Sequence, residues 1–270
     1  MHAPAPASII DPDLLLLAYR SGIFPMADGR DDPEIFWVEP RMRAVIPLGG
    51  LRVSRSLART LRRGRYRVTC NAAFEQVLAA CAAPRDDAPD SWISARIAAS
   101  YRLLHARGEA HSIECWDGEA LVGGLYGVGF GRVFCGESMF SRASDASKVA
   151  LVWLVAALQR GGCVLLDCQF MTDHLASLGA VEIPQEAYVA QLRDAQQDQV
   201  QPGEVEPLGL GLGAAVGEGA GEGEGETAAL GLPAGFAALL AEAEAEAEAG
   251  ACGASSSPGN FIAQLFTQTS

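Results

Sequence analysis

The 270-residue sequence has a single lysine, no Cys-x-x-Cys pair and no long apolar run. A membrane-spanning helix needs about 18 consecutive apolar residues, whereas the run of leucines at 14–17 has four. Seven cysteines without close pairs argue against a zinc site or a disulfide framework and indicate a reducing compartment. The N-terminus also lacks a basic segment followed by an apolar stretch and a cleavage site. We therefore expect a cytoplasmic protein outside the membrane, with no bound metal.

Basic residues are missing from the C-terminal quarter of the chain. Residues 201–270 contain ten Glu and no Asp, Lys or Arg, so most of the formal charge of −13 arises there. Acidic residues are missing from a different stretch, between Glu39 and Glu75, which contains nine Arg. Acid-free basic blocks are typical of surfaces that contact polyanions. The negative net charge therefore does not exclude a nucleic-acid partner.

A short basic helix is predicted within the acid-free stretch, beginning at Ser54 or Ser56 and ending at Gly64. At about 100° per residue, two leucines at 57 and 61 fall on one side and four arginines fall within one arc on the other. These arginines are Arg55, Arg59, Arg62 and Arg63. The basic face is either an ordinary solvated surface or a contact for a polyanion, and the absence of neighbouring acids favours the contact.

The pattern along residues 1–200 predicts an α+β protein with a central mixed sheet flanked by helices. Helices are expected over 13–20, 54–63, 73–82, 93–107 and 148–160. Strands are expected over 36–38, 44–46, 67–70, 111–116, 120–130, 132–134 and 164–168. We place a small α+β domain at 1–50, a larger domain at 51–200 and a low-complexity acidic insert at 201–258. An apolar segment at 259–270 would dock on the body.

The insert is rich in Gly, Ala and Glu, and residues 242–249 alternate strictly between Glu and Ala. On a helix, this alternation places like charges four residues apart, where they repel. Low-complexity segments of this kind do not bury enough apolar surface to fold on their own. We therefore expect the insert to be disordered.

Polar residues follow two apolar strands at the points where each strand should end. Glu137 and Ser138 come after 133–134, and the Asp-Cys-Gln run at 167–169 comes after 164–166. Two such clusters in one domain predict a shared site. Two other patterns are weaker. A nucleotide-binding turn must lead into a helix, and the glycines of 123–131 are not followed by one. A nucleophile system of Cys168 with His174 is less favoured than a structural role for the histidine.

Several motifs in a fixed order resemble the bacterial leucyl/phenylalanyl-tRNA–protein transferases. The matching stretches are AYRSGIFPM at 18–26, Trp37 with Pro40, SRSL at 54–57, SWI at 91–93, LHARGEAHSIE at 104–114, LVGGLYG at 121–127, FCGESMF at 134–140, ASK at 146–148, LDCQ at 166–169 and His174-Leu175. The resemblance covers about residues 10–192.

The resemblance implies an aminoacyltransferase that moves Leu or Phe, and Met less well, from aminoacyl-tRNA to proteins with N-terminal Arg or Lys. The product would be marked for degradation by the bacterial N-degron pathway. The family also implies a GNAT-like fold for the larger, catalytic domain, no cofactor and a monomer. The chain lacks the R-x-x-G-x-G/A loop of acyl-CoA-dependent relatives. An acyl-CoA N-acyltransferase and a non-catalytic tRNA-binding module are the alternative interpretations.

The resemblance to the family assigns roles in the reaction to three residues. Asp167 would accept a hydrogen bond and orient or polarise the attacking amine, and it stays open whether it is a general base. Gln169, two residues further along a strand, would align the reacting groups. Glu137 would read the cationic first residue of the acceptor or support the site.

The donor and its tRNA are assigned to other residues by the same resemblance. The apolar donor side chain would occupy a pocket formed by Leu125, Phe134, Met139, Leu154 and Leu166, with Ser138 beside it. Trp37 and Trp92 would stack on the terminal adenosine, or else pack between domains. The four arginines of the basic helix would contact the tRNA backbone. Two departures from the family are Gln185, where Arg is common, and the insert.

Overall fold

The centre of the protein is a hairpin that continues into a third antiparallel strand. The computed structural model describes residues 9–84, 90–197, 231–249 and 258–267. Strands β5 (Ala110–Asp117) and β6 (Ala120–Phe130) pair with Asp117 opposite Ala120, which confirms the hairpin predicted there. Strand β7 (Val133–Ser141) then pairs antiparallel with β6. The glycine-rich run at 123–131 is therefore mostly strand, and it does not open a helix.

Four more strands complete a seven-stranded mixed sheet in the order β4-β5-β6-β7-β8-β3-β9. Their bounds are β3 Met42–Ile46, β4 Arg67–Cys70, β8 Leu165–Gln169 and β9 Val181–Pro184. β7 and β8 pair in parallel, and the other neighbouring strands pair antiparallel. The predicted α+β class with a mixed sheet is confirmed.

The parallel pair β7–β8 creates the opening in which the site lies. Its register ends at Cys135 opposite Asp167, although β7 runs on to Ser141. Parallel strands need a crossover connection, and helix α5 (Ala146–Arg160) provides it. Beyond Cys135, the end of β7 faces the end of β8 without backbone pairing, which leaves space for a ligand between the strands.

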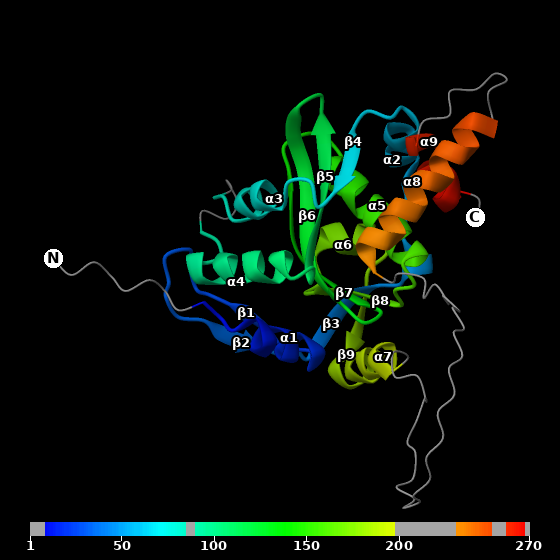
Figure 1. Cartoon of the computed structure of the whole chain (residues 1–270). Coiled ribbons are helices and arrows are strands. Elements are labelled where there is room, and N and C mark those ends of the chain that lie inside the picture. The colour runs from blue at the N-terminus through cyan, green and yellow to red at the C-terminus, as the bar shows by residue number, and fades with distance from the viewer. Residues whose placement is uncertain (1–8, 85–89, 198–230, 250–257, 268–270) are drawn as a thin grey trace, which may run out of the picture.

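Helices cover both faces of the sheet (Figure 1). One apolar core includes residues of α1 (Pro12–Arg20), α3 (Phe74–Cys81), α4 (Ala95–Ala106) and α7 (Gln185–Gln197). A second core is built around α5, with α2 (Arg55–Arg62), α8 (Leu232–Ala249) and α9 (Pro258–Thr267). The short elements are the two-stranded sheet β1 (Phe24–Met26) and β2 (Phe36–Val38), the 3-10 turn η1 (Leu48–Gly50) and α6 (Asp173–Ser177). None of the helices in the described ranges is long and apolar enough to cross a membrane.

Residues 42–46, which the prediction assigns to the N-terminal domain, form β3 of the main sheet. β3 lies between β8 and β9 and pairs with both. Four of its five residues are buried, including Arg43. The N-terminal part of the chain therefore contributes a strand directly beside β8, where the sequence places Asp167.

The expectation of a disordered insert is wrong for residues 232–249, which form helix α8 packed on α5. Four apolar residues at spacings of three to four positions form the buried stripe of α8: Leu232, Phe236, Leu239 and Ala243. Phe236 packs on Trp153, with ring centroids 5.6 Å apart. Glu242 forms an ion pair with Arg160 at 2.9 Å, which offsets part of the repulsion within the Glu-Ala run. The rest of the predicted insert, 201–230 and 250–257, lies outside the described residues.

The predicted docking of the apolar C-terminal segment is confirmed by α9. Phe261, Ile262 and Ala263 are buried in the same core as α5. The residues that follow Thr267 are outside the described ranges. Helices α8 and α9 are thus both packed parts of the fold, although the sequence pattern predicted docking for the segment of α9 alone.

Candidate active site

A cavity of about 600 Å³ lies where β7 and β8 part. Its walls come from β6, β7, α5 and β8, and Met26 and Trp92 close it on the side of the N-terminal elements. Eight of the predicted site residues line it: Trp92, Leu125, Glu137, Ser138, Met139, Leu154, Leu166 and Gln169. Residues from two polar clusters about 30 residues apart in sequence therefore meet in one cavity, as predicted. The expected strand end before Glu137 is wrong, because Glu137 and Ser138 lie within β7.

Glu137 is the buried carboxylate of this cavity, with an exposed fraction of 9%. The Tyr101 hydroxyl donates to its Oε2 at 2.8 Å, and Gln169 Nε2 donates to its Oε1 at 3.0 Å. The Tyr101 hydroxyl also lies 2.5 Å from that of Tyr19. Burial raises the pKa of Glu137 to about 7, while hydrogen bonds from Tyr101, Tyr19 and Gln169 oppose the shift. Near neutral pH the protonated and ionised forms of this carboxyl are therefore both populated.

Asp167 has an exposed fraction of 0% and does not line the cavity. Arg43 binds it through two bonds, Nε to Oδ1 at 2.8 Å and a terminal nitrogen to Oδ2 at 2.6 Å. The Tyr188 hydroxyl donates to Oδ2 at 3.2 Å, and the Gln169 amide donates to Oδ1 at 2.8 Å. Four donors thus occupy this carboxylate and hold it in a fixed orientation behind the cavity wall.

Arg43 is the site residue that sequence reasoning missed. Its guanidinium lies between the rings of Phe24 and Tyr188, 4.8 and 4.4 Å from their centroids, and donates to Gly22 O at 2.9 Å. Burial alone would lower its pKa, but the bonds and charge of Asp167 raise it above the ordinary value. The available signal was an arginine in the middle of an apolar strand, where an unpaired charge is costly.

Gln169 links the buried ion pair to the cavity. Its φ of 63° lies in the left-handed region, which is uncommon outside glycine and costs energy. Its amide donates to Asp167 while its side chain donates to Glu137. The strained residue therefore connects two carboxylates, one fixed and the other in contact with the cavity.

Leucines and a methionine form one apolar wall of the cavity. Leu125, Leu154 and Leu166 are almost fully buried, and Met139 and Leu151 complete this wall. An unbranched Met adapts its shape to different apolar ligands. The Cys168 thiol also lines the cavity, but burial raises its pKa, which disfavours a nucleophilic thiolate. His174, interpreted from sequence as structural, lies on the cavity as well.

Two predicted donor-binding residues lie outside the cavity. Phe134 is buried in the core around α5, under β6. Trp37 is on β2 opposite Pro25, with 41% of its surface exposed. The structure thus brings Trp92, but not Trp37, to the cavity wall.

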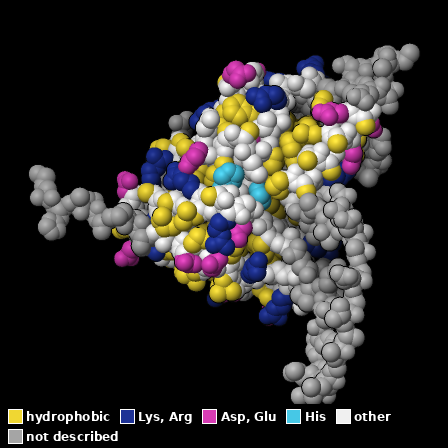
Figure 2. Space-filling view, viewed as in Figure 1, with side chains coloured by type: hydrophobic (Ala, Val, Ile, Leu, Met, Phe, Trp, Pro, Cys, Tyr) yellow, Lys and Arg dark blue, Asp and Glu magenta, His cyan; other side chains and the backbone are white. Residues whose placement is uncertain are grey.

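The basic helix is confirmed as α2, with the predicted division of its faces. The Ser54 hydroxyl accepts from the Leu57 amide at 3.2 Å and caps the helix. Leu57, Ala58 and Leu61 are buried. The four arginines are exposed: Arg55, Arg59, Arg62 and Arg63. The face in Figure 2 mixes basic, acidic and apolar side chains.

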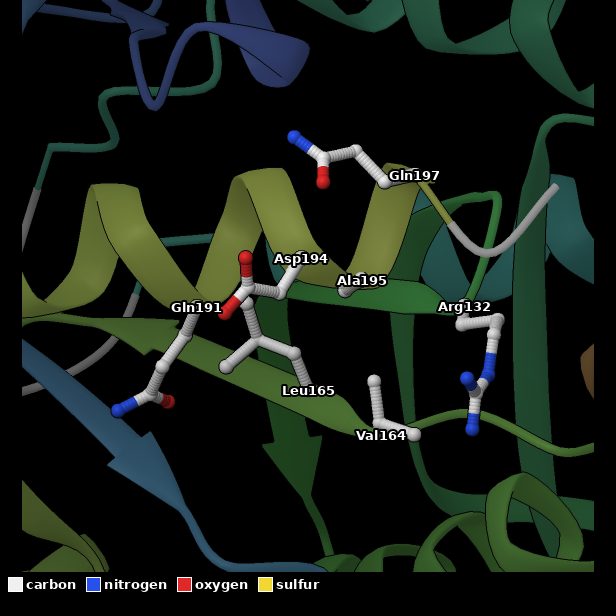
Figure 3. Close-up of a pocket in the computed structure, with 7 residues that line it drawn as sticks. All are labelled: Arg132, Val164, Leu165, Gln191, Asp194, Ala195 and Gln197. Atoms are coloured by element: carbon white, nitrogen blue, oxygen red, sulfur yellow. The ribbon is translucent and has the colours of Figure 1, made fainter. Parts of the chain in front are cut away.

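A second cavity, of about 390 Å³, lies between α7 and the start of β8. Figure 3 shows Gln191 and Asp194 projecting from α7 on one side and Arg132 on the other. It contains none of the predicted site residues and no buried carboxylate. The cavity between β7 and β8 is therefore the candidate active site.

Two family models match most of residues 9–193. The model of the family "Leucyl/phenylalanyl-tRNA protein transferase" matches residues 45–193, and the model of its N-terminal domain matches residues 9–41. All the residues that line the cavity fall within these matches. The first three residues of β3, Met42, Arg43 and Ala44, lie between the two matches. Helices α8 and α9 lie beyond them.

Three similar proteins are each named leucyl/phenylalanyl-tRNA–protein transferase. The one from Novosphingobium aromaticivorans is 72% identical over 187 residues, which is 69% of this chain and 71% of that protein. The one from Rhizorhabdus wittichii is 60% identical over 183 residues, with coverages of 68% and 74%. The one from Zymomonas mobilis is 56% identical over 188 residues, with 70% of each chain covered.

Proposed function

The chain belongs to the leucyl/phenylalanyl-tRNA–protein transferase family, and from that premise we propose the substrates and roles that follow. The donor is aminoacyl-tRNA carrying Leu or Phe, with Met used less well. The acceptor is the α-amino group of a protein that begins with Arg or Lys, and the product is marked for degradation. The observation that carries the proposal is a buried carboxylate, Glu137, in a cavity whose remaining walls are largely apolar.

The reaction is aminolysis of an ester. The acceptor nitrogen forms a bond to the aminoacyl carbonyl, and the bond from that carbon to the 3′-oxygen of the terminal adenosine breaks. The amine loses a proton and the leaving oxygen gains one. The α-amino group has a pKa of about 7.7–8.0 and is partly neutral at physiological pH. Positioning of the two substrates and stabilisation of charge can therefore supply much of the rate enhancement.

Glu137 recognises the cationic first residue of the acceptor in this proposal. An unpaired charge in a buried site is costly, and the raised pKa of Glu137 reflects that cost. An incoming guanidinium or ammonium would stabilise the ionised carboxylate and lower its pKa. A neutral first residue would leave Glu137 unpaired, which gives the site a physical basis for preferring Arg and Lys.

Asp167 acts as a positioning residue rather than a base. Its oxygens are occupied by Arg43, Tyr188 and the Gln169 amide, and it has no exposed surface from which to take a proton. It holds Gln169 in its left-handed conformation, and Gln169 in turn holds Glu137. The Gln169 side-chain amide has a second N–H and an oxygen besides the N–H given to Glu137, and these align the reacting groups.

The donor occupies the apolar wall and extends towards the N-terminal elements. Leu125, Met139, Leu154 and Leu166 surround the Leu or Phe side chain, and Ser138 lies at the same wall. Trp92 stacks on the terminal adenosine from the cavity rim, and the exposed ring of Trp37 is available for the same contact. Phe134 supports this wall from the core.

The body of the tRNA is held by α2. Its exposed arginines contact backbone phosphates, so binding tolerates different tRNA sequences and weakens with salt. We propose that the protein acts as a cytoplasmic monomer and needs no cofactor.

The proposal is tested by mixing the full-length protein with Leu-tRNA labelled on the amino acid and a peptide that begins with Arg. We expect labelled Leu at the peptide N-terminus and little transfer to the same peptide beginning with Ala. Acylation from acetyl-CoA without transfer from tRNA would support an N-acyltransferase instead. Binding of tRNA without any transfer would support a non-catalytic module.

A further inference from the structure

Helix α9 packs directly on the basic helix α2. Phe261, Ile262 and Ala263 of α9 belong to the same buried core as Leu57 and Leu61 of α2. Figure 1 shows the two helices side by side, and they are in contact. The apolar side of the arginine row is thus covered by a helix that lies beyond the family match.

The contact between the two helices is a backbone contact that depends on a glycine. Gly259 lies in the first turn of α9, and a Cβ there would collide with the backbone oxygen of Leu61, in the last turn of α2. The nearest atom after the Leu61 carbonyl is the Cα of Gly64, at 3.5 Å from that Cβ position. A backbone carbonyl cannot rotate away as a side chain can, so any side chain at 259 must separate α9 from the end of α2.

The basic helix has little else to fix its orientation. It is eight residues long, and isolated helices shorter than about 12 residues are marginal in water. Its buried face consists of Leu57, Ala58 and Leu61. Besides α9, the helix that packs against it is α5. Where Arg55, Arg59 and Arg62 point is therefore set largely by the packing partners of that small face.

Helix α9 is in turn anchored by α8. The two are in contact, and α8 lies on α5 through a second glycine, Gly235, where a Cβ would collide with the Ala157 oxygen. The Gly231 amide also donates to Gly161 O at 2.9 Å. Helix α5 forms one wall of the active-site cavity. A continuous packed path therefore runs from α5 through α8 and α9 to α2.

Helix α9 carries no charged residue over Pro258–Thr267. It neither attracts nor repels phosphate, so an influence on tRNA must act through the position of α2. We propose that α9, through Gly259, is a positioning element that sets the basic helix for contact with the tRNA backbone. The inference rests on the proposed role of α2 and extends it to a part of the chain beyond the family match.

The test compares two donors in the full-length protein: Leu-tRNA and leucyl-adenosine, which carries the same ester but no tRNA body. Variants Gly259→Ala and Gly259→Leu displace α9 from α2. We expect kcat/KM with Leu-tRNA to fall about tenfold, mostly through KM, because one or two phosphate contacts are lost. The slope of log affinity against log salt should become shallower by about 1 to 2. With leucyl-adenosine, kcat/KM should stay within about twofold of the wild type, since α2 does not touch the adenosine.

The matched control is Gln264→Leu, which adds an apolar side chain to the exposed side of the same helix. It should leave both donors unaffected. Equal losses with both donors in the Gly259 variants would indicate general destabilisation and overturn the inference, as would unchanged use of Leu-tRNA. Replacing Arg59 and Arg62 with Glu tests the role of α2 separately from the role of α9. If reversal weakens use of Leu-tRNA and the Gly259 variants do not, the role of α2 stands and that of α9 fails.

Discussion

Glu137 and Asp167 are both buried carboxylates, yet their surroundings give them different chemistry. Asp167 meets a guanidinium at 2.6 Å, a phenol and an amide. Glu137 meets only neutral donors, the Tyr101 hydroxyl and the Gln169 amide. Desolvation of Glu137 is therefore not balanced by a positive charge. A charge that the protein leaves unpaired is suited to bind a cation from outside.

A first prediction concerns stability of the Glu137→Gln variant. The folded pKa of about 7 lies above the ordinary value of 4.5, so between these pH values the folded state holds a proton that the unfolded state has lost. Stability of the wild type therefore declines as pH rises through this window. The variant lacks the effect, and its unfolding free energy relative to wild type should rise by about 3 kcal/mol from pH 4 to pH 8.

Urea unfolding at several pH values measures this difference. The control is Glu75→Gln, at an exposed residue whose pair with Arg102 lies on the surface. Its difference curve should be nearly flat, because surface pairs contribute little. A flat curve for Glu137→Gln as well would show that Glu137 is not desolvated in the folded protein.

A second prediction concerns Asp167. Asp167→Ala should abolish transfer and leave tRNA affinity nearly unchanged, because its side chain lies behind the cavity and bonds to Arg43, Tyr188 and the Gln169 amide, none of which belongs to α2. Removing one partner of a buried ion pair leaves the other charge uncompensated, so unfolding free energy should fall by about 3–5 kcal/mol. Transfer assays, tRNA titration and urea unfolding give the three values.

The double variant Arg43→Met, Asp167→Ala provides the comparison for Asp167→Ala. Without the unpaired guanidinium, much of the lost stability should return, while transfer stays absent because Gln169 is no longer held. Recovery of transfer in the double variant, or a large loss of tRNA affinity in the single one, would contradict the positioning role of Asp167.

At the scale of elements, α8 shows how tertiary packing changes the meaning of a pattern. The Glu-Ala alternation suggests repulsion along an isolated helix. In the folded chain, Ala243 is buried in the core around α5 and Glu242 pairs with Arg160. Ala and Glu both have high helix propensity, so the segment becomes stable once one side has a partner.

A third prediction tests that packing. Leu239 of α8 has an exposed fraction of 0%, and Leu239→Ala should lower the unfolding free energy by about 2–5 kcal/mol through loss of buried surface and a residual cavity. Leu17→Ala, at a residue that is 60% exposed on α1, removes the same atoms and should cost about 0.5 kcal/mol or less. Equal costs for the two variants would show that α8 is not docked on α5.

At the scale of the whole molecule, the charge of the chain is divided between regions with different roles. Its C-terminal quarter has no cation and ten Glu, whereas α2 and its C-cap residue Arg63 together have four exposed arginines. Opposite charges in one chain attract at low ionic strength, and salt weakens the attraction. Our fourth prediction is therefore that these acidic residues compete with tRNA phosphates for α2.

Deleting residues 203–230 removes six of the Glu and preserves α8 and α9. We expect tRNA affinity to increase at low salt and the increase to vanish at high salt. Changing the same six Glu to Gln keeps the chain length and should reproduce the increase if charge is responsible. Unchanged affinity of the deletion variant at low salt would reject the competition.

Local patterns in the sequence were enough to predict several elements and their chemistry. The hairpin at Asp117 and the split faces of α2 depend on near neighbours and on side-chain period, and the structure confirms them. The pattern places the polar residues at 137–138 after the end of a strand, but they lie within β7, which runs on to Ser141. The family motifs are likewise linear, and the comparisons confirm the family. Roles of individual residues within the site stay predictions.

Contacts between distant segments were decided only by the tertiary structure. Arg43 meets Asp167 across 124 residues of sequence because β3 pairs with β8, and no local pattern encodes that pairing. The same holds for Phe236 on Trp153 and for Gly259 against Leu61. Burial and partners determine whether a charge is stable, whether a pKa shifts and whether a Glu-Ala run folds. The sequence by itself therefore determined the family and eight of the residues that line the cavity, and the packing of distant segments decided which carboxylate faces the cavity and which helices cover the basic helix.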